Sequence, residues 1–565
     1  MHFEKILYSK KNQFIDFKSL REKKILSIKK DIFYELAKIA FTQMRFFLGT
    51  EHLNKWFEIL ISLDASQEEK EKIKINFLAT IESKNKNLPY CQDCGTDILY
   101  LFRGDKIIFS GEKNIFDHVQ EGATFARKKN PFRSSIFLPT ENFSEKNSGD
   151  NSPCELHNFF WHKEDEVYGI FCNKGGGSGS KFWNFSKKPS LAQNRHELKK
   201  FLYEKISEIG HSACPPYNFY IVLGGLSQLQ NSEILTRASV EDPFLEKNFP
   251  FISQDQDLEK EIMQDLKKAN IGAQTKGKYF MMTTGIKIFR APRHAVPFFV
   301  GMGLSCSANR IQHFKINKDG IFLEKLEKNP EKFLLEKFKN QTEKSYIKNN
   351  LADKKGNLFF QKDFKQEGPK KFAINLDKEK NIVLKKLRNL KSGENFLFSG
   401  NVIIARDKAH FCWWKNFQEK KFLPNYLKKY LAVLYIGPAD IPKNEIIGSI
   451  GPTTAARMDE FAEFLFKNNL LFLSIAKGSR SKKFALLCKK YKGIFAAVQG
   501  GPASYLRKFV CSQKILDFED LGMEAVRLFE IKNMPAQIIV DSNGNDFYQE
   551  MMDKFIPFDT QFEGN

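Results

Sequence analysis

The stretch that decides the fold class is residues 470–502, which read LLFLSIAKGSRSKKFALLCKKYKGIFAAVQGGP. Leu470–Ala476 is a short apolar run of the kind that forms a buried strand, and Ser481–Tyr491 has the spacing of a helix. Ile494–Val498 predicts a second strand, which ends at turn residues 500–502. Strands that alternate with helices are typical of an α/β domain.

The same alternation continues on both sides of this stretch and predicts one α/β domain over residues 372–565. Val402–Ala405 and Gln537–Val540 are predicted strands, and the apolar residues from Met458 to Leu465 have helical spacing. The last strand leads into a turn at residues 541–546, which is rich in Asp and Asn.

The first 327 residues predict a mixed α+β domain. Helical spacing near the N-terminus is carried by Phe33, Leu36, Ala37 and Ala40. From about residue 86 to residue 310, short apolar runs are broken by Gly, Pro and Asn, and Tyr217–Leu223 is the best buried strand among them. Residues 328–371 are strongly polar and predict a linker between the two domains.

Composition and charge narrow the function classes. The chain has 565 residues, 42% apolar and 28% charged, which is the balance of a globular protein. No apolar run reaches the ~18–20 residues that a membrane span needs, and the N-terminus lacks the apolar core of a signal peptide, so we expect a cytoplasmic protein. Lys and Arg (89) exceed Asp and Glu (67) by 22. This excess leaves open binding to nucleic acid or to an anionic membrane, or a merely Lys-rich surface.

Three cysteine segments have unusual surroundings. Cys91 and Cys94 form a lone C-x-x-C in CQDCGT, which is half a zinc site or a redox dithiol, and no second C-x-x-C accompanies it. Cys214 is followed by two prolines in ACPPY, either as a buried thiol or as an iron–sulfur ligand. Cys306 in SCSANR follows His294 by twelve residues, and a lone His in such a place is more often a satisfied core residue.

A glycine loop and three cationic segments suit an anionic ligand. KGGGS at Lys174 can aim backbone N–H groups at an anion, or can simply be a flexible loop. GPTTAARMD at Gly451 puts two hydroxyls and Arg457 at an expected helix start. ARDKAH at Ala405 and AKGSRS at Ala476 follow predicted strands, where α/β domains bind ligands, although solvated loops are the alternative.

These segments together predict a small carboxylate substrate and a metal cluster. The sequence has neither GxxxxGK[ST] nor a GxGxxG unit, so it contains no recognisable nucleotide-binding loop. Cations without such a loop suggest a small carboxylate substrate. Three well-separated cysteines suggest a cluster that lacks one protein ligand, and an iron without a protein ligand is an open Lewis acid.

In these segments the chain resembles the iron-dependent class I fumarate hydratases of the single-chain type. The resemblance covers roughly residues 88–325 and 372–550. The segments that carry it are CQDCGTDI at Cys91, KGGGSGSK at Lys174, ACPPY at Ala213, RHAVPFF at Arg293 with SCSANR at Ser305, ARDKAH at Ala405, GPTTAARMD at Gly451, AKGSRS at Ala476, GGPA at Gly500, LGMEAV at Leu521 and DSNGNDF at Asp541.

The resemblance implies one four-iron four-sulfur cluster on Cys91, Cys214 and Cys306. Cys94 departs from the family, which usually has Thr there, and Asp97 stands where Ala is usual. We interpret Cys94 as a neighbour of the cluster, and Cys172 matches no ligand.

The resemblance also implies the catalytic groups. Thr453 is the family-like base for the C3 proton of malate, and Asp93 with His294 is the pair that handles the leaving hydroxyl. An ordinary Thr is too weak a base, so the helix N-terminus and nearby cations would have to lower its pKa. The substrate carboxylates would be bound by Gln92, Arg133, Gly176, Gly177, Arg406, Thr454, Arg457 and Lys477.

The implied function is the reversible hydration of fumarate to (S)-malate, a step of the tricarboxylic acid cycle, by an oxygen-sensitive lyase that forms a homodimer. Its partner is then a small dicarboxylate, with neither nucleic acid nor membrane. The alternative enzyme is a sister hydro-lyase acting on tartrate or mesaconate, which differs in pocket shape. The alternative of another class is a basic nucleic-acid-binding protein.

Overall fold

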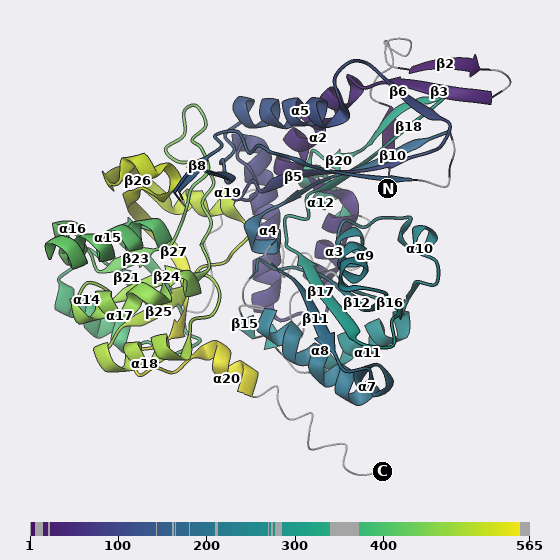
Figure 1. The fold of residues 1–565 in the computed structure, drawn as a ribbon. Coiled ribbons are helices and arrows are strands. Elements are labelled where there is room, and N and C mark those ends of the chain that lie inside the picture. The colour runs from purple at the N-terminus through teal and green to yellow at the C-terminus, as the bar shows by residue number, and fades with distance from the viewer. Residues whose placement is uncertain are drawn as a thin grey trace. The chain divides into compact units, whose positions relative to one another are not determined.

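The computed structural model describes residues 2–5, 15–20, 23–142, 144–160, 163, 165–179, 181–209, 213–268, 271–272, 275–276, 285–339 and 372–553. The chain divides into two compact units. Unit 1 comprises Met1–Glu71, Cys91–Leu326 and Met551–Asn565, and unit 2 comprises Lys72–Tyr90 and Glu327–Glu550. Both units mix helices with strands (Figure 1), which confirms the predicted α/β class.

Unit 1 contains a six-stranded sheet with two helices packed on it. The strand order is β1 (Phe3–Lys5), β19 (Gly320–Glu324), β18 (Ile311–Asn317), β10 (Val167–Lys174), β5 (Thr96–Arg103) and β9 (Glu155–Phe160). Helices α2 (Ile32–Phe46) and α5 (Ile115–Lys129) bury one face of it in a shared apolar core. The predicted helical residues Phe33, Leu36, Ala37 and Ala40 are all buried in that core, so the helix expected there is confirmed.

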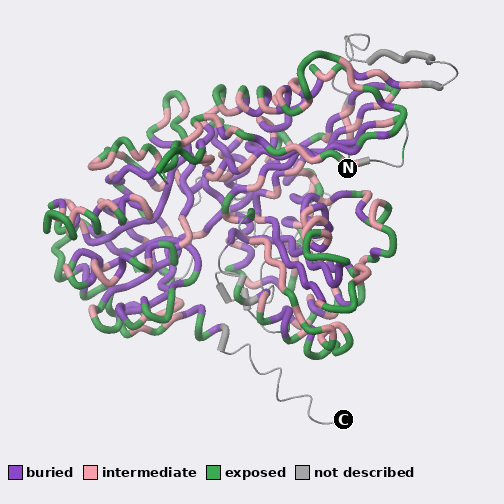
Figure 2. The backbone as a smooth tube through the Cα atoms, in the orientation of Figure 1, coloured by how far each residue is buried: buried purple, intermediate pink, exposed green. Residues whose placement is uncertain are grey.

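A second, five-stranded sheet of unit 1 positions two of the cysteines. Its order is β11 (Phe182–Lys187), β17 (Phe298–Ser305), β12 (Asn218–Gly225), β16 (Gly285–Arg293) and β13 (Ser253–Gln254). Strand β12 confirms the predicted strand at Tyr217–Leu223, and β12 and β17 are buried along their whole lengths (Figure 2). Because β12 and β17 are antiparallel, with Asn218 opposite Ser305, the start of β12 and the end of β17 share one end of the sheet.

The other elements of unit 1 are short strands and covering helices. The helices are α3 (Thr50–Ile61), α6 (Gly176–Gly179), α7 (Ser190–Gln193), α8 (Arg195–Ile209), α9 (Gln228–Ala238), α10 (Leu245–Asn248) and α11 (Gln256–Lys268). The strands are β2 (Ile15–Leu20), β3 (Lys23–Lys29), β4 (Leu48–Gly49), β6 (Ile107–Ser110), β7 (Phe137–Pro139), β8 (Glu145–Asn147), β14 (Ile271–Gly272), β15 (Thr275–Lys276) and β20 (Leu326–Glu327).

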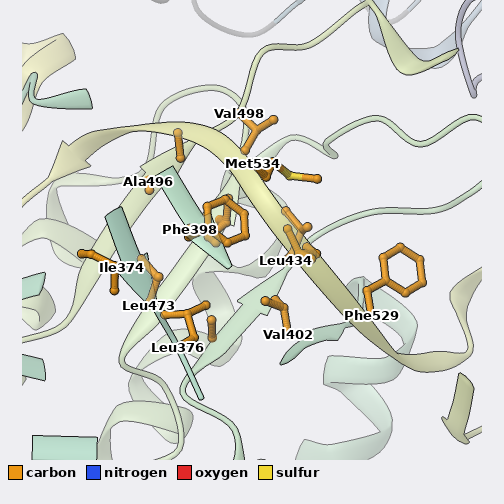
Figure 3. Packing of buried hydrophobic residues seen from close by; sticks show 14 of the residues in the cluster. Ile374, Leu376, Phe398, Val402, Leu434, Leu473, Ala496, Val498, Phe529 and Met534 are labelled. Carbon is orange, nitrogen blue, oxygen red and sulfur yellow. The ribbon is translucent and has the colours of Figure 1, made fainter. Parts of the chain in front are cut away.

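Unit 2 is built on a seven-stranded sheet. Its order is β21 (Phe372–Asn375), β22 (Asn395–Ile404), β23 (Ala432–Leu434), β24 (Leu473–Ala476), β25 (Ile494–Ala497), β27 (Val526–Val540) and β26 (Val510–Asp517). The strands from β21 to β25 are parallel, whereas β27 is antiparallel and also pairs with β22, which closes five strands into a ring. Apolar side chains such as Phe398, Leu434 and Met534 form the core inside (Figure 3).

Helices connect and cover these strands. They are α4 (Gln67–Lys86), α12 (Pro330–Lys339), α14 (Lys380–Arg388), α15 (Asp407–Lys420), α16 (Asn425–Lys429), α17 (Asp459–Lys467), α18 (Lys482–Tyr491), α19 (Ala503–Leu506) and α20 (Phe547–Asp553), with 3-10 turns η1 (Ala455–Met458), η2 (Arg507–Phe509) and η3 (Glu519–Glu524). The alternation of β24, α18 and β25 confirms the elements predicted from residues 470–502. Among the described helices, none is long and apolar enough to cross a membrane.

Two segments differ from a simple N-terminal and C-terminal division. Residues 72–90 pack with unit 2, since Ser504 Oγ donates to the Ala79 carbonyl at 2.7 Å and Lys508 pairs with Glu82 at 2.7 Å. Of the polar stretch predicted as a linker (residues 328–371), residues 330–339 form helix α12 directly after residues 328–329, and residues 340–371 lie outside the described residues.

Candidate active site

Asp93 joins segments of unit 1 that lie far apart in the sequence. Its side chain accepts hydrogen bonds from the backbone N–H groups of Gly95 (3.1 Å) and Gly176 (2.8 Å). Its carbonyl accepts from Arg310 Nη1 at 2.6 Å, and Arg133 Nη2 lies 3.4 Å from its Oδ1. The cysteine loop, the glycine loop and the SCSANR segment, which were separate motifs in the sequence, therefore meet at one residue, Asp93.

The charge on Asp93 follows from these contacts. Burial raises the pKa of this carboxyl, but Arg133, Arg310 and the two backbone N–H groups outweigh burial and hold the pKa below its usual range. Asp93 is therefore an anion near neutral pH. The predicted substrate contacts Gln92 and Gly176 are on the same two loops, with Gln92 largely buried and Gly176 exposed.

The structure brings together the three predicted cluster ligands. Cys214 lies just before β12, Cys306 follows β17, and Ser307 N donates to the Cys214 carbonyl at 2.9 Å. Burial is the main reason that the pKa of the Cys91 thiol is raised to about 12; Asp93, Cys214 and Cys306 also raise it, and Arg310 lowers it. Because Cys214 and Cys306 are both close enough to affect the Cys91 thiol, the three cysteines lie in one region.

This donor set fits a cluster better than a single ion. Among the described residues, no three His, Cys, Asp or Glu side chains are arranged to hold one metal ion. In a four-iron cluster each thiolate binds a different iron, so the sulfur atoms stand further apart than around one ion. Three neighbouring thiols with cationic Arg310 beside them are the residues of this region that could hold such a cluster.

Cys94 has a different environment from Cys91. Its Sγ accepts a hydrogen bond from Arg133 N at 3.2 Å, and its side chain packs with Phe46 and Phe132. Arg45 ion-pairs with Asp97 at 2.7 Å and donates to the Cys94 carbonyl at 3.3 Å, with both charged side chains fully buried. The residue that departs from the family, Asp97, is thus one half of a buried pair that holds the cysteine loop.

Cys172 lies on β10, at the edge of a small cavity that Lys174, Cys306 and Arg310 also line. Burial raises the pKa of the Cys172 thiol to about 11, against the opposing effect of Lys174. Cys172 is thus a buried thiol beside the group of three.

His294 lies at the other end of the second sheet. It is exposed in the turn between β16 and β17, where its Nδ1 is 2.9 Å from the Val296 carbonyl. Cys306 follows the opposite end of β17, and the eight residues of that strand span about 23 Å at ~3.3 Å per residue. Within one chain, the structure therefore does not bring His294 to Asp93.

In unit 2, the predicted cations follow parallel strands. Arg406 comes after β22 and Lys477 directly after β24, so both are at the carboxyl edge of the sheet. Lys477 N donates to the Thr453 carbonyl at 3.1 Å, and Ala455 N donates to the Lys477 carbonyl at 2.8 Å. Thr454 pairs with Lys477 in a parallel bridge, so hydroxyls and cations share this edge.

The local structure at Thr453 corrects one expectation. The α-helix predicted to begin there starts only at Asp459 as α17, and the preceding turn η1 is a 3-10 turn of four residues. Thr454 makes no side-chain capping bond to that turn. A long helix dipole is therefore absent next to Thr453, and the nearby cations are the remaining source of positive potential.

Both arginines of unit 2 that were predicted to bind substrate are ion-paired to acids. Arg457 Nη2 lies 2.6 Å from Asp407 Oδ1, and Arg406 Nη2 lies 3.1 Å from Glu524 Oε1. Burial raises the pKa of Asp407, but Arg406 and Arg457 outweigh this effect and hold it below its usual range. Sequence reasoning assigned no role to Arg310, Asp407 or Glu524, although each lies in a quoted motif.

The comparisons with known proteins agree with the motifs. The family model described as "Fumarate hydratase (Fumerase)" matches residues 34–315, and the one described as "Fumarase C-terminus" matches residues 320–551. "Fumarate hydratase 1, mitochondrial" of Leishmania major is 33% identical over 530 residues, which are 91% of this chain and 89% of that protein. The chain belongs to the class I fumarate hydratase family.

Other relatives match either most of this chain or one part of it. "Fumarate hydratase class I, aerobic" of Escherichia coli (strain K12) is 31% identical over 534 residues, 93% of this chain and 91% of that protein. A Methanocaldococcus jannaschii protein provisionally named L(+)-tartrate dehydratase subunit beta is 30% identical over 178 residues, 31% of this chain and 91% of that protein. The resemblance to class I fumarate hydratases stated from the motifs is thereby confirmed.

Proposed function

We propose that this chain is a hydro-lyase that catalyses the reversible hydration of fumarate to (S)-malate. The observation that carries the proposal is the group of three thiols beside Asp93 and Arg310, in a chain of the fumarate hydratase family. The cations at the carboxyl edge of unit 2 add the positive charge that a dicarboxylate needs.

Cys91, Cys214 and Cys306 would hold the four-iron four-sulfur cluster. Such a cluster, when bound, supplies an open Lewis-acid iron for the substrate hydroxyl and an adjacent carboxylate. Arg310 is buried next to these thiols and is electrostatically coupled to Cys91 and Cys306. Its positive charge offsets part of the negative charge that thiolates bring into a buried site.

The remaining groups bind and orient the dicarboxylate. Backbone N–H groups of Gly176 and Gly177, with Gln92 and Arg133, are the groups of unit 1 that would bind a carboxylate. Arg406, Thr454, Arg457 and Lys477 are the corresponding groups of unit 2. Removing the C3 proton of malate adds charge to the far carboxylate, and fixed cations stabilise charge that develops in the transition state.

Thr453 would take the C3 proton on its Oγ. Its main chain is held on both sides, because Thr453 N donates to the Tyr435 carbonyl at 2.8 Å and its own carbonyl accepts from Lys477 N. This geometry fixes the Thr453 backbone beside the Lys477 segment. A neighbouring positive charge favours the deprotonated hydroxyl and lowers its pKa.

Asp93 and His294 would handle the leaving hydroxyl, and His294 would come from a second copy of the chain. The end of the sheet that carries His294 also exposes large apolar side chains: Leu226 (58%), Leu229 (79%), Phe251 (89%) and Val296 (64%). A homodimer in which this surface of one copy packs against the Asp93 region of the other would cover these side chains and bring the imidazole to the partner's Asp93.

The test is anaerobic reconstitution with iron and sulfide, followed by assays with fumarate, malate, both tartrates and mesaconate. The proposal expects a brown protein that interconverts fumarate and malate with the highest kcat/KM. A higher kcat/KM for tartrate would favour the alternative, a sister hydro-lyase, in line with the similarity to the tartrate dehydratase beta subunit. A protein that binds no iron and converts none of the five would contradict both. The cytoplasmic location stays a prediction.

A further inference from the structure

The LGMEAV segment at residues 521–526 has no role in the chemistry described so far, yet it provides a buried acid next to a substrate-binding residue. Glu524 is buried at the end of η3. Its Oε1 lies 3.1 Å from Arg406 Nη2, and its Oε2 accepts a hydrogen bond from Lys408 N at 3.1 Å. One carboxylate therefore holds both the Arg406 guanidinium and the first turn of α15.

Asp407 plays the matching part for the second arginine. Its Oδ1 lies 2.6 Å from Arg457 Nη2 and 3.8 Å from Arg406 Nε. Within the described part of the chain, Asp407 is the only ion-pair partner of Arg457. The four side chains form a row in the order Glu524, Arg406, Asp407 and Arg457, with the charges alternating.

The row has a physical consequence for carboxylate binding. Two guanidinium groups side by side repel each other, and long Arg side chains lose rotamer freedom when a ligand fixes them. The acids offset that repulsion and fix both side chains before a ligand arrives. A guanidinium has five N–H donors, and the ion pair of Arg457 with Asp407 uses one nitrogen, while the Arg457 side chain is 44% exposed. Donors thus remain for a ligand carboxylate.

We propose that Asp407 and Glu524 are positioning residues that preorganise Arg406 and Arg457 as the receptor for one carboxylate of the substrate. The inference rests on the proposed function, because it takes the dicarboxylate as the ligand. Arg406, Arg457 and Lys477 carry three positive charges against the two negative charges of the acids, so the receptor keeps a net attraction for an anion.

The experiment uses the reconstituted full chain with Glu524→Gln and Asp407→Asn, which keep the shape of each side chain and remove its charge. For each variant, kcat and KM for fumarate are measured, together with the Kd of succinate, an unreactive dicarboxylate, by calorimetry. We expect KM and the succinate Kd to rise together by about tenfold while kcat changes less than about threefold, because preorganisation serves bound substrate and transition state alike.

Matched variants separate positioning from folding. Asp520→Asn removes an exposed charge from the same turn and should leave KM and Kd unchanged. Glu524→Asp keeps the charge on a shorter side chain and should recover part of the loss. Asp407 is partly exposed, so Asp407→Asn remains a test if Glu524→Gln fails to fold.

Three outcomes would overturn the proposal in different ways. A lowered Tm with wild-type KM and succinate Kd in both variants would show that the acids serve stability alone. A wild-type protein that neither hydrates fumarate nor binds succinate would contradict the proposed function itself, and with it the receptor. If the wild type is active and both variants keep its KM and succinate Kd, the positioning role is wrong and the proposed function is unaffected.

Discussion

The three thiols of unit 1 and the cations at the carboxyl edge of the unit 2 sheet are positioned by different means. In unit 1, loops from distant parts of the chain meet through buried polar contacts, such as Arg310 to the Asp93 carbonyl across 217 residues. In unit 2, Arg406 and Lys477 follow parallel strands of one sheet. Strand order therefore places Arg406 and Lys477 at one edge of a sheet, whereas the Cys91 loop joins Cys214 and Cys306 through long-range contacts.

The largest expected effect is on the thiols. Cys91→Ser, Cys214→Ser and Cys306→Ser should each abolish the cluster chromophore and the activity, because a hydroxyl is a poor replacement for a thiolate on iron. Visible absorption, iron content and fumarate hydration on the same anaerobic samples measure this. Cys94→Ser is the matched control and should retain most of both. Loss of the chromophore in Cys94→Ser with retention in Cys91→Ser would reverse the assignment.

Exposure to air should remove nearly all activity in a recoverable way. An iron without a protein ligand is open to oxidants and can be lost, whereas the cations of unit 2 are indifferent to oxygen. Activity is followed during aerobic incubation with a chelator and then after addition of iron and thiol under nitrogen. Full activity after prolonged exposure to air and a chelator would contradict the open-iron mechanism.

His294→Ala should lower kcat by about 10²–10⁴-fold, the usual contribution of a general acid–base group. Mixing this variant with Asp93→Asn chains tests where the imidazole acts. If it acts on the partner, hybrid dimers have one intact site, and random mixing should restore about a quarter of wild-type activity. No recovery after verified subunit exchange would place His294 in its own chain's site or outside catalysis.

Arg457→Lys should lower kcat/KM by roughly 30–1,000-fold, or about 2–4 kcal/mol, because Lys keeps the charge but loses the planar fork. Arg457→Ala should be worse, since it leaves the substrate carboxylate unpaired. The cluster spectrum should stay intact in both variants. If Arg457 only pairs with Asp407 and does not bind substrate, Arg457→Lys should lower Tm and leave kcat/KM near the wild-type value. Tm and kcat/KM are therefore measured on the same preparation.

The smallest effect on kcat should come from Asp97→Ala, which acts on stability instead. It leaves Arg45 buried without its carboxylate, and breaking such a pair costs about 3–5 kcal/mol. We expect a clearly lower Tm together with near-normal KM at low temperature. The conservative double change Arg45→Met with Asp97→Ala should recover Tm. A Tm equal to wild type in Asp97→Ala would show that the pair does not hold the cysteine loop.

The local apolar pattern of the sequence was enough to predict several helices and strands near the site. The apolar spacing of α2 and the alternation of β24, α18 and β25 predicted those elements correctly, because periodicity reports which face of a segment is buried. The position of Thr453 before a regular α-helix was not predicted correctly. A 3-10 turn and the first turn of an α-helix differ in hydrogen bonding by one residue, which apolar spacing does not distinguish.

By itself, the sequence determined the chemical groups of this protein: the cysteines with their neighbours, the glycine loop and the cations at strand ends. Only the tertiary structure decided how they combine. It placed Arg310 against Asp93, paired Arg457 with Asp407 and Arg406 with Glu524, and put His294 at the far end of β17 from Cys306. The reason is physical: residue types and local spacing reveal burial and chemistry, whereas side-chain pairing over long separations depends on how sheets and loops pack.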